Sequence, residues 1–236
     1  MSNSVKTLVF AAALCLVCSI LLTAAATGLK GFQQKNIAVD KQKNILKSVG
    51  LIDPQQKYSA EAIEKLYGEN IRSFWVDSAG RILNATERSK KDLPIYLYLK
   101  ENQIETYIVP INSRGLWGRI LGYLAIKNDG TTVSGFTVYK HSETPGLGGE
   151  IEQNWFQNNF VGKKTIDRQG NFVSIHIAKG TVRDIISEEK RLNYVDGISG
   201  ATLTGKFLSE GLKDILLDYE PVSLRFRKNQ IGELKD

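Results

Sequence analysis

An uncharged, apolar segment near the beginning of the chain constrains its organisation more than any other feature. The segment covers the 23 residues between Lys6 and Lys30. A helix rises by about 1.5 Å per residue, so a helix of this length crosses the hydrocarbon core of a bilayer. A cleaved secretory signal is the alternative, since small residues at positions 24–26 follow an apolar start. The apolar run continues past these positions, which favours an uncleaved anchor over residues 7–29 behind a tail of residues 1–6.

The lysines that flank this segment leave the orientation of the anchor open. A single lysine precedes the segment, whereas several follow it, and the positive-inside rule would then keep the following domain in the cytoplasm. Long downstream domains can be translocated despite such charges, and N-terminal apolar segments commonly act as export signals. The lysines that follow the segment are Lys30, Lys35, Lys41, Lys43 and Lys47.

The composition indicates the size of the core, the kind of partner and the absence of sites built on cysteine. A chain of 236 residues, 42% of them hydrophobic, can bury one sizeable core. The net charge of +6 comes without a zinc finger or an RNA-binding signature, so a basic surface near a membrane explains it better than a nucleic-acid partner. Cys15 and Cys18, the only cysteines, both lie in the apolar segment. We therefore expect no disulfide framework, no metal site built on cysteine and no iron–sulfur cluster in the rest of the chain.

A helical stalk is expected over residues 30–70. Apolar residues recur at helical spacing among lysines from Gln33 to Ser48, and Gly50 is a plausible end to that helix. A short helix follows, with Ser59 as its N-cap, a body over Ala60–Tyr67 and Gly68 as its terminator.

The pattern changes to that of strands from Ile71 onward, so residues 71–236 are expected to form one α+β domain with a mainly antiparallel sheet flanked by helices. The turn signal Asn128-Asp129-Gly130 joins the last two strands in a hairpin. The expected strands are Ser73–Val76, Ile95–Leu99, Glu105–Ile108, Leu121–Ile126 and Val133–Tyr139.

The remainder of the chain mixes helices and strands. A helix is expected around Glu152–Phe160, and a strand over Phe172–Ile177 would place Phe172, Ser174 and His176 on one face. An alternating pattern over Val222–Lys228 indicates an edge strand. A helix is expected between these two strands. Its inner face is an apolar stripe formed by Leu203, Phe207, Leu208, Leu212, Ile215 and Leu216.

A glycine-rich loop, HSETPGLGGE at residues 141–150, follows the hairpin. Three glycines within four residues permit unusual backbone angles and the close approach of a planar ligand. Glu143 and Thr144 can form hydrogen bonds with the polar edge of a ring, and Leu147 can cover a ring face. On its composition alone, the segment is more often a solvated connecting loop.

A second stretch, DGISGAT at residues 196–202, lies between a strand-like run and the apolar-striped helix. Thr202 is therefore expected at a helix N-terminus, where free backbone N–H groups and the helix dipole favour a phosphate. Its hydroxyl can also accept a phosphoryl group. An ordinary loop with a capping Ser199 or Thr202 explains the same pattern, and capping alone favours that simpler interpretation.

The two stretches together resemble a known family. DGISGAT matches the flavinylation motif Asp-x-x-Ser/Thr-Gly-Ala-Thr, and HSETPGLGGEI is similar to the segment that frames the flavin ring in FMN-binding domains. Arg114–Gly118, Gly122–Ile126 and the anchor fall in the order of the C subunits of Na⁺-translocating NADH:quinone oxidoreductases. The G subunits of Rnf electron-transport complexes are the alternative. One departure is Gly205, where this family would be expected to have a small polar residue.

The resemblance assigns roles to individual residues. It implies that a flavin transferase uses FAD to join the FMN phosphate to Oγ1 of Thr202, with Thr204 as the rival attachment site. The transferase would recognise Asp196, Gly200, Ala201 and Thr202. Further contacts with the cofactor are implied for Glu143, Thr144, Leu147, Lys179, Ser199, Gly200, Ala201 and Thr204. Lys179 would favour reduced flavin, although an exposed lysine at a strand end is equally plausible.

The resemblance also implies a function. The chain would relay electrons between an iron–sulfur-bearing donor subunit and a flavin-bearing acceptor subunit, with no catalytic residues of its own and no NADH or quinone site. It would be a single-pass protein of the bacterial inner membrane, with its FMN domain on the periplasmic side. Two alternatives are a hydrolase that uses Ser199 with His141 or His176, and a tethered domain with a purely structural role.

Overall fold

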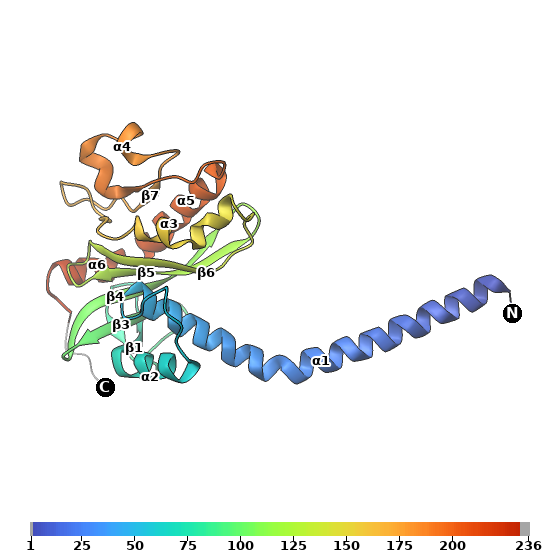
Figure 1. Ribbon diagram of the computed structural model, residues 1–236. Coiled ribbons are helices and arrows are strands. Elements are labelled where there is room, and N and C mark those ends of the chain that lie inside the picture. Colours follow the sequence, from blue (N-terminus) through green and yellow to red (C-terminus); the bar gives the residue numbers. More distant parts are fainter. Residues whose placement is uncertain (1, 232–236) are drawn as a thin grey trace. The chain divides into compact units, whose positions relative to one another are not determined.

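The computed structural model describes residues 2–231, and these residues divide into two compact units between Asp40 and Lys41. Helix α1 (Asn3–Ser48) contributes residues to both units (Figure 1). The part of α1 that lies in the first unit exposes large apolar side chains, such as those of Leu8, Phe10 and Leu22. In the described part of the chain, α1 is the one helix long and apolar enough to cross a membrane. The expected anchor and the first part of the expected stalk therefore lie in the same helix.

The second unit is built on a six-stranded antiparallel sheet with the strand order β2-β1-β3-β4-β5-β6. Each of the five expected strands lies within one of its members. Because neighbours in sequence pair in space from β3 to β6, these strands form a meander. The strands are β1 (Ile71–Val76), β2 (Ile82–Leu83), β3 (Leu93–Lys100), β4 (Gln103–Arg114), β5 (Arg119–Lys127) and β6 (Val133–Lys140).

Helices cover both faces of this sheet. Figure 1 shows α3 (Asn154–Asn158) and α5 (Thr202–Asp218) on one side and α2 (Ala60–Asn70) on the other. Helix α5 buries Leu208, Leu212 and Leu216, which are spaced by four residues and form one stripe against the core. The expected α+β architecture, an antiparallel sheet flanked by helices, is confirmed.

The ends of the first two helices follow capping rules. Gly50 has φ of +73°, and the amides of Gly50 and Leu51 donate to the last carbonyls of α1, which confirms Gly50 as the stop. Ser59 caps α2, as expected. The expected end at Gly68 is wrong: α2 continues to Asn70, whose side-chain amide donates to the carbonyl of Leu66.

Two expectations for the later segments are wrong. Val222–Lys228 is not an edge strand but largely a helix, α6 (Glu220–Arg227). Val222 and Phe226 are four residues apart, a spacing that fits a helical face as well as an alternating strand, and Pro221 suits a first helical turn. The strand expected over Phe172–Ile177 shrinks to β7 (His176–Ile177), because Ser174 has φ of +69° and breaks the alternation.

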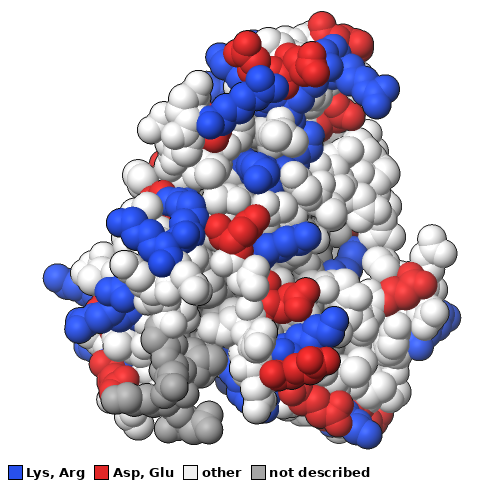
Figure 2. Space-filling view, turned by 90° about the vertical axis from the view of Figure 1, so that its left-hand side faces the viewer, with Lys and Arg blue, Asp and Glu red and all other residues white. Residues whose placement is uncertain are grey.

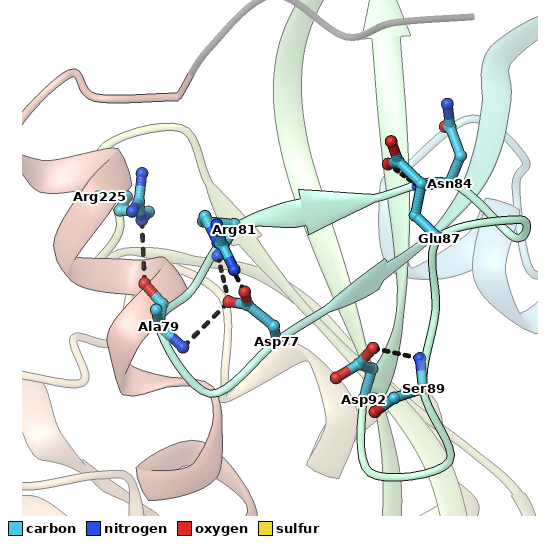
Figure 3. Close-up of polar contacts among 8 residues, drawn as sticks. All are labelled: Asp77, Ala79, Arg81, Asn84, Glu87, Ser89, Asp92 and Arg225. Atoms are coloured by element: carbon cyan, nitrogen blue, oxygen red, sulfur yellow. Dashed lines mark hydrogen bonds and ion pairs between the residues drawn. The ribbon is translucent and has the colours of Figure 1, made fainter.

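Contacts in the middle and the last turn of α6 explain its position. The ring of Phe226 stacks on that of Tyr107 at 4.4 Å, and the Tyr107 hydroxyl lies 2.7 Å from that of Ser223. Arg225 donates to the carbonyl of Ala79 in the turn between β1 and β2 at 3.0 Å (Figure 3). These contacts join α6 to the core and to one edge of the sheet.

A small region of short elements completes the second unit. Two short strands pair in parallel within it, β7 with β8 (Tyr194–Val195). The helix expected around Glu152–Phe160 is present as the shorter α3. The other short elements are η1 (Gly148–Glu152), α4 (Val182–Ile185) and η2 (Glu188–Asn193).

Candidate functional site

The two sequence stretches meet in one depression with a volume of about 330 Å³. The loop between β4 and β5, the glycine-rich loop after β6 and the N-terminus of α5 form its walls. Its lining residues are Leu116, Trp117, Glu143, Thr144, Leu147, Gly148, Gly200, Ala201, Thr202, Leu203 and Thr204. A larger depression of about 380 Å³ is lined by His176 and Tyr194 and contains none of the residues expected to contact FMN.

Glu143 holds the three walls together. Its side chain is buried, with 5% of the residue exposed. One carboxylate oxygen accepts the backbone N–H of Trp117 at 3.0 Å, and the other accepts the hydroxyl of Thr204 at 2.5 Å. A buried carboxylate with charge-assisted bonds to two other segments fixes the geometry of the loops that carry them. The structure thus supports a role for Glu143 in shaping the site.

The N-terminus of α5 opens into this depression. Thr202 is the first residue of the helix, and the N-cap, Ala201, makes no side-chain hydrogen bond. The amides of a first helical turn have no partner within their helix, and the dipole adds partial positive charge there. The preceding Gly200 has φ of +74°, which turns the chain sharply into the helix. This geometry is suited to a phosphate group.

Two threonines near this terminus differ in accessibility. Thr202 is exposed at the edge of the depression. Thr204 is 1% exposed, and its hydroxyl is engaged with Glu143. Of the two hydroxyls, that of Thr202 is the one open to an incoming reactant.

The first half of the DGISGAT stretch contacts a neighbouring loop instead of the depression. The carboxylate of Asp196 accepts the N–H of Val182 at 2.7 Å, and the N–H of Gly197 donates to the carbonyl of Gly180 at 2.9 Å. Ser199 and Lys179 are both exposed and lie outside the lining residues. The structure brings together Glu143, Thr144, Leu147, Gly200, Ala201, Thr202 and Thr204, and leaves Asp196, Ser199 and Lys179 at the periphery.

Apolar side chains at the rim were not predicted as site residues. Trp117 is 68% exposed and Leu116 is 38% exposed, both in the loop between β4 and β5. Leu203 was expected on the inner face of α5 but is 51% exposed at the depression, because Thr204 and Gly205 form the buried face of the first turn. A Leu-Trp pair between two glycines is the sequence signal that points to such an exposed apolar loop.

The contacts of the two histidines do not fit the serine-hydrolase alternative. No histidine belongs to the lining residues. His141 is engaged with Glu152 and with the N–H of Glu143, and His176 lies 2.9 Å from the carbonyl of Val173. Neither ring is positioned as a base for Ser199.

Comparison with known proteins agrees with this geometry. Residues 115–217 match the model of the FMN-binding domain family. The C subunit (NqrC) of the Na⁺-translocating NADH-quinone reductase of Yersinia pestis is 36% identical over 229 residues, which cover 84% of this chain and 83% of that protein. The chain belongs to the NqrC family. The NqrC of Pseudomonas aeruginosa is 32% identical, with 86% of this chain and 88% of that protein covered.

Solved structures of the NqrC family have the same fold. The crystal structure of NqrC from Parabacteroides distasonis superposes with a TM-score of 0.70 at 31% identity and covers 83% of this chain and 96% of that one. The structure of the Shewanella oneidensis protein has a TM-score of 0.61 at 20% identity and shows the fold alone. The chain is thus a subunit of this oxidoreductase with an FMN-binding domain, and α1 together with the family indicates a membrane-anchored subunit.

Proposed function

We propose that this chain carries one FMN in a phosphoester bond to Oγ1 of Thr202 and relays electrons through it. The observation that carries the proposal is the exposed Thr202 at the N-terminus of α5, facing a depression whose other walls are the glycine-rich loop and an apolar loop. The buried, hydrogen-bonded hydroxyl of Thr204 makes that residue a poorer acceptor.

The lining residues fit the parts of FMN. The first-turn amides of α5 would receive the phosphate, and Thr144 would hydrogen-bond the polar edge of the ring. The exposed apolar side chains of Leu116, Trp117, Leu147 and Leu203 would cover the ring and exclude water from it. Bound FMN supplies the redox chemistry, while the chain sets its position and surroundings.

Attachment of the cofactor needs one group transfer. Oγ1 of Thr202 would form a bond to the phosphorus on the flavin side of FAD. The bond between that phosphorus and the bridging oxygen would break, AMP would leave, and the hydroxyl proton would pass to the phosphate of AMP or to water. A dedicated flavin transferase would catalyse this step. Asp196, Gly200 and Ala201 would belong to the segment that the transferase recognises, and Ser199 would complete the turn around the phosphate.

A role in passing electrons between two other subunits explains why the flavin would be attached covalently. A flavin that must accept and pass on electrons in every cycle benefits from permanent attachment, above all on the periplasmic side of the membrane, where lost FMN is not replaced. The donor would be an iron–sulfur-bearing subunit of the complex and the acceptor a flavin-bearing subunit. Lys179, exposed beside this region, would favour reduced flavin through its positive charge.

Flavin fluorescence of the denatured protein tests the attachment site. The chain is co-expressed with a flavin transferase and separated on a denaturing gel, where only covalent flavin remains with the polypeptide. We expect a fluorescent band for the wild type and for Thr204→Val, and none for Thr202→Val. A fluorescent Thr202→Val band would refute the attachment site, and a dark wild-type band would refute the covalent flavin.

A further inference from the structure

A chain of hydrogen bonds begins at the last turn of α1. The ammonium group of Lys47 donates to Oε1 of Gln157 at 2.8 Å. Gln157 is 2% exposed, and its Nε2 donates to the carbonyls of Ile151 at 3.4 Å and of Glu152 at 3.1 Å. One buried amide therefore joins the end of α1 to η1, the short helix that continues the glycine-rich loop.

The chain continues through the side chain of Glu152 into the depression. Nε2 of His141 lies 3.1 Å from a carboxylate oxygen of Glu152. Nδ1 of His141 accepts the N–H of Glu143 at 3.1 Å, so in the neutral ring the proton resides on Nε2 and points to Glu152. The final members are the Glu143 carboxylate and its two donors, the N–H of Trp117 and the hydroxyl of Thr204.

The first member of this chain is held in an unusual way. Burial lowers the pKa of Lys47, and the positive charge of Lys43 lowers it further. The ammonium is thus partly desolvated, and its partner is a neutral amide instead of a carboxylate. That amide is oriented, because Gln157 directs its oxygen to α1 and its nitrogen to η1.

The end of α1 is also packed rigidly on the sheet. Ile45, Leu46 and Ser48 are buried. A Cβ atom on Gly135 of β6 would come within 2.1 Å of the carbonyl oxygen of Ser48, which shows how closely the helix and the strand approach. The turn that carries Lys47 is therefore held against β6, at the position from which its ammonium reaches Gln157.

We propose that Lys47, Gln157 and His141 are positioning residues that couple the last turn of α1 to the Glu143 carboxylate. Through them, the end of the stalk fixes the glycine-rich loop and with it the floor of the depression. The coupling concerns this chain alone, whereas its effect on a flavin rests on the function proposed above.

Hydrogen exchange in the protein without flavin tests the coupling. The ¹⁵N-labelled full-length chain is expressed without a flavin transferase, placed in detergent micelles and followed by NMR. The reporters are the amides of Glu143 and Trp117, which donate within the chain of hydrogen bonds. We expect Lys47→Met to accelerate exchange at both reporters about fivefold, the size expected for the loss of one partly buried hydrogen bond. Lys41→Met, which removes an exposed lysine six residues earlier in α1, should leave both rates unchanged.

A double-mutant cycle separates coupling from general loosening. His141→Asn keeps an acceptor for the N–H of Glu143 but removes the link to Glu152. In that background, Lys47→Met should no longer change the two reporter rates. The coupling is refuted if Lys47→Met acts equally in both backgrounds, if it has no effect, or if it accelerates the amide of Leu124 in the middle of β5 as much as the reporters. Since no flavin is present, failure here is distinguishable from failure of the covalent attachment.

Discussion

At the scale of residues, the site depends on positions where a side chain would not fit. A Cβ atom on Gly148 would lie 2.5 Å from Oγ1 of Thr204 and 2.8 Å from a carboxylate oxygen of Glu143. Gly200 adopts φ of +74°, a conformation that L-residues disfavour. Glycine at these two positions therefore permits the buried hydrogen bond between Glu143 and Thr204 and the turn into α5.

Alanine substitutions test this requirement. Gly148→Ala must separate Thr204 from Glu143, and we expect it to lower the free energy of unfolding by about 1–3 kcal/mol. Gly200→Ala should cost about 1–2 kcal/mol through its backbone conformation. Gly68→Ala is the control, because a Cβ atom at this position of α2 meets open space. Alanine favours a helix more than glycine does, so this substitution should stabilise the protein by about 1 kcal/mol. Urea unfolding of the full-length chain in detergent, followed by tryptophan fluorescence, measures all three, and a Gly148→Ala variant as stable as the wild type would contradict the packing.

At the scale of elements, local patterns predicted the sheet but not the elements that depend on distant contacts. The five long strands carry β-branched and aromatic runs that favour one conformation. Helix α6 was predicted as a strand, because its two buried residues fit both periodicities and its position is set by Tyr107 and Ala79, far away in the sequence. Residues of both sequence motifs line the depression, whereas the exposure of Trp117 and the burial of Thr204 depend on how two loops and the N-terminus of α5 meet.

The turn between β1 and β2 shows how one carboxylate holds an element in place (Figure 3). Oδ1 of Asp77 accepts the N–H groups of Ala79 and Arg81, and its Oδ2 pairs with the Arg81 guanidinium at 2.7 Å. Partial burial raises the pKa of Asp77, but these bonds outweigh it and hold the pKa below its usual value. The same turn presents the Ala79 carbonyl to Arg225 of α6.

This lowered pKa predicts a pH dependence of stability. A carboxyl group whose folded-state pKa is lowered stabilises the protein above its ordinary pKa of about 4, and the stabilisation is lost as pH falls through the folded-state value. Asp77→Ala should therefore cost about 1–2 kcal/mol at pH 7 and less at pH 3. Asp77→Asn keeps an acceptor for the two N–H groups, so it should lower the free energy of unfolding by less than Asp77→Ala does. Its effect should also vary less with pH. Equal costs of Asp77→Ala at both pH values, measured by urea unfolding, would contradict this explanation.

At the scale of the whole molecule, the charges of the second unit and the positions of the cysteines decide how the chain can be labelled. On the face shown in Figure 2, acidic and basic side chains are interspersed, so the basic excess does not form a continuous patch there. The two cysteines are exposed on the apolar part of α1. The second unit therefore accepts an introduced cysteine as a unique label once Cys15 and Cys18 are replaced by serine.

Such a label tests the proposed orientation in the membrane. Ser78 is exposed in the turn between β1 and β2, and Ser4 is exposed before the apolar segment. In spheroplasts, we expect a membrane-impermeant maleimide to label Ser78→Cys at once and Ser4→Cys only after lysis. The opposite pattern would place the FMN-binding domain in the cytoplasm.

The central claim is that Thr202 holds FMN covalently, and peptide mass spectrometry tests it most directly. Trypsin releases residues 192–206, which contain Ser199, Thr202 and Thr204, by cleavage after Arg191 and Lys206. For the wild type co-expressed with a flavin transferase, we expect this peptide with the added mass of one FMN, and fragment ions that place the addition on Thr202. An unmodified peptide, or fragment ions that place the addition on Thr204 or Ser199, would contradict it.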